Sequence, residues 1–113
     1  MTNAERKIAA KVLQAMGNPI RLGVLEAIRE QPKTVNQLVE ELSCSQSMMS
    51  QQIQKLKHHG LVTSKKVRAY KYCSLRNPDV LSVLNCVYGH LQRTLSQNGV
   101  DMEVAQPEQG KGM

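Results

Sequence analysis

Residues 44–60 constrain the fold more than any other stretch, because one helical face is apolar and the other is unusually polar. Met49, Ile53 and Leu56 are spaced by four and then three residues, the period of a buried α-helical face. Ser45 suits the N-cap of this helix, and Gly60 follows its predicted end. The opposite face carries hydroxyls, amides and cations: Gln46, Ser47, Ser50, Gln51, Gln54, Lys55, Lys57 and His58. Amides and hydroxyls suit base edges in a major groove, and lysines reach phosphates, so we predict a DNA recognition helix.

Three further helices are predicted before this one. The first covers about residues 3–16, and Gly17 ends it. Asn18 and Pro19 form a cap followed by a first-turn proline, which starts a second helix that runs to about Glu30. Thr34, with Gln37 three residues later, is a capping box for the third helix, which ends near residue 42. Two short helices joined by a few residues are typical of a helix-turn-helix.

The period changes after Gly60. Residues 61–63 and 70–75 are predicted as paired strands, with residues 64–69 as their loop. The cations expected in that loop are Lys65, Lys66 and Arg68. A last helix is predicted over about residues 78–96. The expected fold is mainly α with a small β-hairpin, a winged helix-turn-helix formed by residues 1–98, and residues 99–113 are expected to be a disordered tail.

The charge pattern indicates a polyanionic partner. The chain has 113 residues and a formal net charge of +6. No acidic residue occurs between Glu41 and Asp79, whereas seven lysines and arginines do. A solvated basic face is the simpler alternative, but the basic block coincides with the predicted recognition helix, which favours double-stranded DNA.

The core that this sequence can build is thin. There is no Trp, no Phe and only three Tyr. Small helical domains with such cores often complete their burial by dimerising. We therefore predict a homodimer formed through the first and last helices, both of which carry apolar stripes. Such a dimer would place two recognition helices about 34 Å apart, matched to a near-palindromic operator.

Four stretches make the chain similar to the ArsR/SmtB family of bacterial transcriptional repressors. They are the entry to the second helix (residues 15–22), the helix-turn-helix (residues 38–42, 45–47 and 50–51), its exit (residue 56 and residues 59–62) and the second wing strand (residues 72–75). The resemblance implies a homodimeric repressor that leaves its operator when an effector arrives, and in many members the effector is a metal ion.

The chain departs from the metal-binding patterns of that family. The cysteine pair of arsenite and cadmium sensors would fall near residues 35–37, which are Val, Asn and Gln. The zinc pattern of the last helix is missing around Asp79 and His90. The sulfide- and oxidant-sensing branch, whose wing also lacks glycine, uses one cysteine in the second helix and one in the last helix. Here the second-helix position holds Glu26. In the last helix Gly89 follows Tyr88, so the second cysteine is displaced or missing. No metal site is identified.

The three cysteines leave the effector open. Cys44 lies in the predicted turn, Cys73 in a wing strand and Cys86 in the last helix. Each alone is more simply a small packing residue, but together they are candidates for a thiol switch. The candidate effectors are a metal ion, a reactive sulfur species and an oxidant. His58 and His59 suit a solvated or phosphate-facing role.

Several classes of protein are disfavoured. The N-terminus has no signal peptide pattern, no apolar run approaches the roughly 18 residues of a membrane span, and no catalytic motif occurs. We expect a cytoplasmic DNA-binding regulator that is not an enzyme. Two alternatives remain: an architectural DNA-binding protein without a ligand switch, and a winged-helix protein-interaction module.

Overall fold

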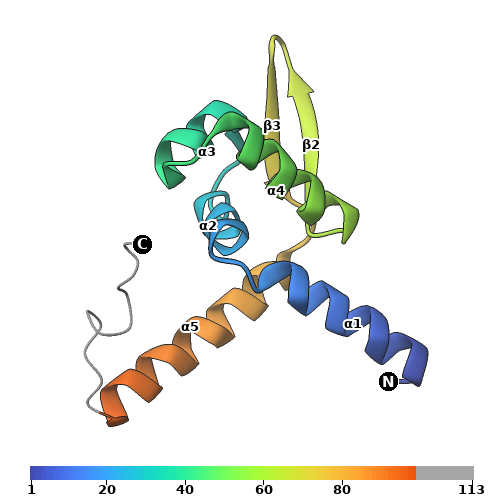
Figure 1. Ribbon diagram of the computed structural model, residues 1–113, viewed down its shortest axis with the longest axis vertical. Coiled ribbons are helices and arrows are strands. Elements are labelled where there is room, and N and C mark those ends of the chain that lie inside the picture. Colours follow the sequence, from blue (N-terminus) through green and yellow to red (C-terminus); the bar gives the residue numbers. More distant parts are fainter. Residues whose placement is uncertain (99–113) are drawn as a thin grey trace. The chain divides into compact units, whose positions relative to one another are not determined.

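The computed structural model describes residues 1–98 of the chain and gives the predicted winged helix-turn-helix order (Figure 1). The elements are α1 (Asn3–Met16), α2 (Pro19–Ala27), β1 (Lys33–Thr34), α3 (Val35–Leu42), α4 (Gln46–His58), β2 (Val62–Val67), β3 (Tyr70–Leu75) and α5 (Pro78–Asn98). Residues 1–81 form one unit, and a second begins at Ser82, within α5. The predicted disordered tail, residues 99–113, lies outside the described residues.

Local capping chemistry sets the helix boundaries that the sequence predicted. The Asn18 side chain accepts hydrogen bonds from the amides of Ile20 and Arg21 at 2.9 and 3.0 Å. The Thr34 hydroxyl accepts from the Gln37 amide at 3.2 Å, and the Gln37 side chain accepts from the Thr34 amide at 2.8 Å. These caps satisfy amides that have no partner within the helix, so each predicted start is confirmed.

The end of α4 is a Schellman motif. The Gly60 amide donates to the Lys57 carbonyl at 2.9 Å, and the Leu61 amide donates to the Leu56 carbonyl at 3.0 Å. Gly60 has a φ of 72°, a conformation that costs glycine little. Leu56 and Leu61 stand at the two positions whose apolar side chains usually accompany this motif, and both are buried. Gly60 therefore ends the recognition helix as predicted.

The core of the first unit joins α2, α3, α4 and the hairpin. Its fully buried side chains are Val24, Leu25, Leu38, Met49, Leu56 and Val62. Met49, Ile53 and Leu56 are all buried, so the predicted inner face of α4 is confirmed. The helix-turn-helix depends on Ser43, which ends α3 with a φ of 53°, and on Ser45, whose hydroxyl accepts from the Met48 amide at 3.0 Å.

The sheet differs from the prediction in two ways. First, β1 pairs antiparallel with β3, which gives three strands in the order β1-β3-β2. Second, β2 extends to Val67, so the expected six-residue loop is wrong: Val67 pairs with Tyr70 across a two-residue turn of Arg68 and Ala69. Lys65 and Lys66 therefore lie within a strand. The regular pairing of β2 with β3 stabilises this longer hairpin, which projects beside α4 (Figure 1).

One helix is shorter than predicted. α2 ends at Ala27, with Ile28 as its C-cap, and does not reach Glu30. Pro32 disfavours helical backbone only at Gln31, whereas the helix already ends at Ile28, whose φ of −98° and ψ of 5° depart from helical values. Lys33 and Thr34 then pair with Cys73 and Tyr72 of β3, and this long-range pairing requires an extended chain there.

Candidate nucleic-acid interface

The outer face of α4 is exposed along its whole length. Every residue predicted to read DNA from this helix is exposed: Gln46, Ser47, Ser50, Gln51, Gln54 and Lys55. Burial of these amides and hydroxyls would have excluded contact with a duplex. The face therefore presents hydrogen-bonding groups that match base edges, on a helix fixed from behind by apolar packing.

Gln52 is a polar residue of α4 that is buried, and the sequence did not lead us to predict its burial. Its side chain is only 7% exposed, and its oxygen accepts from Arg21 Nη1 at 2.6 Å. Arg21 Nε also donates to the Ala15 carbonyl at 2.5 Å. Gln52 is three residues after Met49 and four before Leu56, and this spacing could have placed it on the inner face. One guanidinium thus connects α4 to α2 and to the end of α1.

The alternation of side chains along the hairpin separates the predicted wing cations. Ser64 is opposite the buried Cys73, and Lys66 is opposite Lys71, so these four side chains share the sheet face that meets α4. Lys65 lies on the other face, and Arg68 lies in the turn. The structure therefore brings Lys66 together with Lys71, which was not among the predicted wing cations. The side chains of Lys65 and Lys66 lie on opposite faces of the hairpin.

The turn at the wing tip holds Arg68 in an unusual conformation. Its φ is 59°, in the left-handed region, and it is the first central residue of a two-residue hairpin turn. Glycine usually occupies such positions, because a side chain there makes close contacts with the backbone. The arginine thus keeps an exposed cation at the tip at the cost of backbone strain.

Replacing Arg68 with glycine should increase the stability of the protein and at the same time weaken its binding to DNA. We expect Arg68→Gly to raise the free energy of unfolding by about 0.5–1 kcal/mol, because the strain is relieved. It should also weaken binding to every DNA sequence alike and reduce the salt slope by about 1, because one phosphate contact is lost. Arg68→Ala, the matched control, should lose the same DNA affinity without the gain in stability. Urea unfolding measures the free energy of unfolding, and fluorescence anisotropy at several salt concentrations measures DNA affinity. Equal free energies of unfolding for Arg68→Gly and Arg68→Ala would contradict the claim that the backbone at Arg68 is strained.

Lys55 faces a different part of the unit from the wing. It lines a depression together with Arg21, His58 and His59 and with residues of α1. The rings of His58 and His59 meet edge to face, with centroids 5.1 Å apart. Lys55 therefore adds positive charge on the flank of α4 that is nearest to α1, where a backbone phosphate beside the recognition helix could be reached.

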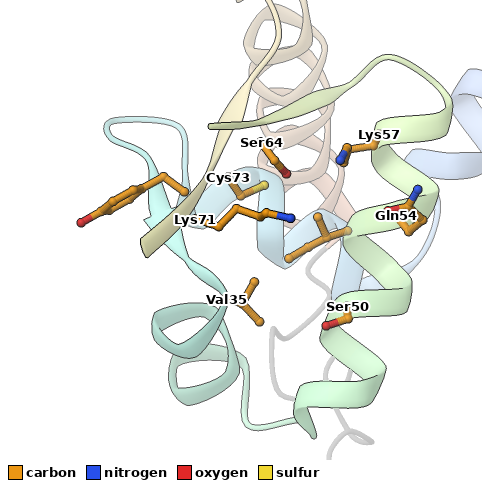
Figure 2. Close-up of a pocket in the computed structure, with 9 residues that line it drawn as sticks. Val35, Ser50, Gln54, Lys57, Ser64, Lys71 and Cys73 are labelled. Carbon is orange, nitrogen blue, oxygen red and sulfur yellow. The ribbon is translucent and has the colours of Figure 1, made fainter. Parts of the chain in front are cut away.

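A pocket of about 160 Å³ lies between α4, the start of α3 and the wing (Figure 2). It is lined by Val35, Ser50, Ile53, Gln54, Lys57, Ser64, Lys71, Tyr72 and Cys73. Two of these, Ser50 and Gln54, belong to the predicted DNA-reading face. The pocket therefore opens on the same side of the molecule as the candidate interface.

The three cysteines have different environments. Cys44 is half-buried in the helix-turn-helix, Cys86 is exposed on α5 and Cys73 is only 2% exposed. Burial raises the pKa of Cys73 from 9.0 to about 11, and the Lys57 ammonium opposes this only in part. Cys73 is consequently a neutral thiol at physiological pH, whereas nucleophilic attack requires the thiolate.

The alkylation of Cys73 should depend on both pH and folding. Because its pKa is about 11 in the folded protein, we expect its reaction with iodoacetamide to accelerate as pH rises toward 11. At every lower pH it should be slower than in the urea-unfolded chain. Peptide mass spectrometry after timed quenching measures this rate for each cysteine. Equal rates for Cys73 in the folded and unfolded chains at pH 7 would contradict the burial.

Neither a metal-binding cluster nor a membrane span is found in the part of the chain described. Within residues 1–98, no group of three His, Cys, Asp or Glu side chains is arranged to hold a metal ion. Over the same range, every helix lacks the length or the apolar character that crossing a bilayer requires.

Comparisons with known proteins agree with this arrangement. The family model described as "Bacterial regulatory protein, arsR family" matches residues 18–64, from the cap of α2 into the wing. The nodulation protein NolR of Rhizobium meliloti is 33% identical over 88 residues, which cover 75% of this chain and 72% of NolR. The HTH-type transcriptional repressor SmtB of Mycobacterium tuberculosis is 33% identical over 58 residues, which cover 51% of this chain and 43% of SmtB.

A solved structure confirms the fold. The homodimeric winged helix-turn-helix DNA-binding domain Mb0332 of Mycobacterium bovis matches with a TM-score of 0.78 at 21% sequence identity. The match covers 86% of this chain and 93% of that one. Since the fold, the exposed face of α4 and the relationship to NolR all agree, the chain belongs to the ArsR family of bacterial regulatory proteins and is a DNA-binding transcriptional regulator.

Proposed function

We propose that this protein is a sequence-specific repressor whose α4 lies in the major groove of its operator. The observation that carries the proposal is the continuous exposed face of amides and hydroxyls on α4, beside a hairpin rich in cations. Gln46, Ser47, Ser50, Gln51 and Gln54 would contact base edges. Lys55, Lys65, Lys66 and Arg68 would contact phosphates, which fix the position of the protein on the duplex. The protein would act in the cytoplasm, by binding and not by catalysis.

The repressor would act as a homodimer formed through α1 and α5. Ile8 and Leu13 of α1 are 64% and 58% exposed, and Val87 and Tyr88 of α5 are 56% and 57% exposed. Tyr88, Leu91, Gln92 and Leu95 also line an apolar groove on α5. Apolar side chains exposed on this scale favour a partner helix over water. The homodimeric state of the Mycobacterium bovis domain supports a dimer, and the exposed apolar side chains are the reason for placing its interface on α1 and α5.

A charge in the apolar groove of α5 should disrupt the dimer. We expect Leu91→Asp to shift the protein from dimer to monomer, because the carboxylate would be buried without a partner. Asn85→Asp adds the same charge to the same helix at an exposed position outside the groove, and should leave the dimer intact. Sedimentation velocity at several protein concentrations measures the change. A dimeric Leu91→Asp protein would exclude this groove from the interface.

An effector would release the repressor from DNA. The candidates are a metal ion, and a reactive sulfur species or oxidant that acts on the thiols of Cys44, Cys73 or Cys86. Cys44 and Cys86 are the more accessible of these thiols, and the buried neutral Cys73 is the least suited to react first.

The proposal is tested by footprinting on the promoter nearest to the gene of this protein. A repressor should protect one short near-palindrome, whereas an architectural DNA-binding protein would show only a shallow sequence preference. A protein-interaction module would protect nothing. Mobility shifts in reductant, oxidant, persulfide and divalent metals would then identify which condition releases the DNA. Absence of a protected site in every condition would overturn the proposal.

A further inference from the structure

The pocket between α4 and the wing carries donors and positive charge but no carboxylate. Figure 2 shows Lys57 extending from α4 toward the strands and Lys71 extending from β3 toward α4. Ser50 and Ser64 add hydroxyls from α4 and β2, and Gln54 adds a side-chain amide. Each ammonium offers three donors and no acceptor, so the polar groups of this pocket are mainly donors. A ligand that fits them must be rich in acceptors.

The positive charge of the pocket is not neutralised by the described part of the protein. Within residues 1–98, no carboxylate lies within ion-pair distance of Lys57 or Lys71. Lys71 is also directly opposite Lys66 in the hairpin, on the same sheet face. Two like charges in such a cross-strand pair destabilise a hairpin. An anion held between the hairpin and α4, next to Lys71, would reduce that repulsion.

The dimensions of the pocket limit the size of its ligand. Its volume of about 160 Å³ is well above the roughly 10–15 Å³ that admits one water molecule. Its lining includes the buried Cys73 and Ile53, the exposed Lys57, Lys71 and Ser50, and the half-buried Ser64. Lys57 lies close enough to the Cys73 thiol to lower its pKa against the effect of burial, so this ammonium acts on the interior of the pocket. A small, compact anion fits this shape.

We propose that this pocket binds a phosphate-type oxyanion between Lys57 and Lys71. Free inorganic phosphate carries nearly two negative charges at neutral pH and a backbone phosphate of DNA carries one, and two ammonium groups can stabilise either charge. The two ligands share phosphate oxygens, which accept hydrogen bonds from the surrounding donors. Ser50 and Gln54 belong both to the pocket and to the face proposed to read bases, so a free ion in the pocket would compete with the duplex. This last consequence rests on the proposed function.

The binding of inorganic phosphate can be tested without DNA. The full-length 15N-labelled protein is titrated with sodium phosphate against sodium chloride, at constant pH and ionic strength, and the amide signals of Ser50 and Ser64 are followed. We expect saturable shifts, and an affinity roughly tenfold or more weaker in Lys57→Gln and in Lys71→Gln, because each loses a charge-assisted hydrogen bond. Lys7→Gln, an exposed lysine of α1 outside the pocket, is the matched control and should bind phosphate as the original protein does.

Two results would overturn the proposal: shifts that do not saturate, or saturable shifts that are the same in the Lys57→Gln and Lys71→Gln variants as in the original protein. Fluorescence anisotropy with a labelled duplex then separates the two sources of phosphate. If phosphate lowers DNA affinity more than chloride does at equal ionic strength, and only when both lysines are present, the pocket also takes a backbone phosphate. If it does not, the pocket takes the free ion alone. If the protein did not bind DNA at all, the anisotropy measured in sodium chloride alone would already show it. The phosphate titration of the labelled protein would still test the pocket, because it contains no DNA.

Discussion

Gln51→Ala is expected to weaken operator binding by about 1–3 kcal/mol, or roughly 5- to 150-fold. The Gln51 side chain is exposed near the middle of the outer face of α4, where it can form two hydrogen bonds with one base. Alanine keeps the helix but removes both bonds. Binding to a random duplex should hardly change, because that affinity comes from phosphate contacts.

The measurement is fluorescence anisotropy on the footprinted operator and on a scrambled duplex, at matched salt. Gln31→Ala is the control, because it removes an exposed glutamine from the turn between α2 and β1, outside both α4 and the wing. If Gln51→Ala lowered the affinity for both duplexes equally, the residue would not read bases. If operator and scrambled DNA bound equally well to the unmodified protein, the repressor proposal itself would fail.

Gln52→Ala, the neighbouring substitution, should act on stability and not on sequence reading. Gln52 is buried, and its side-chain oxygen accepts from Arg21 at 2.6 Å. Alanine would leave part of a half-buried guanidinium without a partner, at a cost of about 1–3 kcal/mol in the free energy of unfolding. Urea unfolding measures the loss. The remaining folded protein should still distinguish the operator from random DNA.

A double-mutant cycle with Arg21→Ala isolates this contact. The two substitutions should be strongly non-additive, because each removes the same hydrogen bond. Gln51→Ala, measured in the same assay, should change stability by less than about 0.5 kcal/mol, as exposed positions usually do. An unchanged unfolding midpoint for Gln52→Ala would show that the hydrogen bond contributes nothing net to stability.

Features that depend on chemistry within a few residues could be predicted from the sequence. Asn18, Thr34 and Ser45 each cap a helix through an amide two or three residues away, and such pairs are visible in the sequence. The end of α4 at Gly60 follows from the same kind of local rule. The order of the elements, and with it the winged helix-turn-helix, came from these signals and from helical periodicity.

Features that depend on distant partners were missed. The strand β1 exists only because Lys33 and Thr34 pair with β3, about forty residues later. Pairing between β2 and β3 placed Lys65 and Lys66 in a strand, and strand alternation then put their side chains on opposite faces. The sequence placed Lys57 on the outer face of the recognition helix but could not bring it together with Lys71, because their shared pocket forms only when the hairpin packs beside α4.

The pairing of β1 with β3 also determines how the two proposed DNA contacts can adapt. Thr34 pairs with Tyr72 through the backbone, while its hydroxyl holds the first turn of α3. The hairpin is thus tied by backbone pairing to the start of α3, the helix that supports α4, and this connection restrains movement of the wing relative to the helix-turn-helix. A duplex whose grooves do not match the fixed separation of wing and helix must itself bend or twist, so the stiffness of the DNA should contribute to the choice of operator.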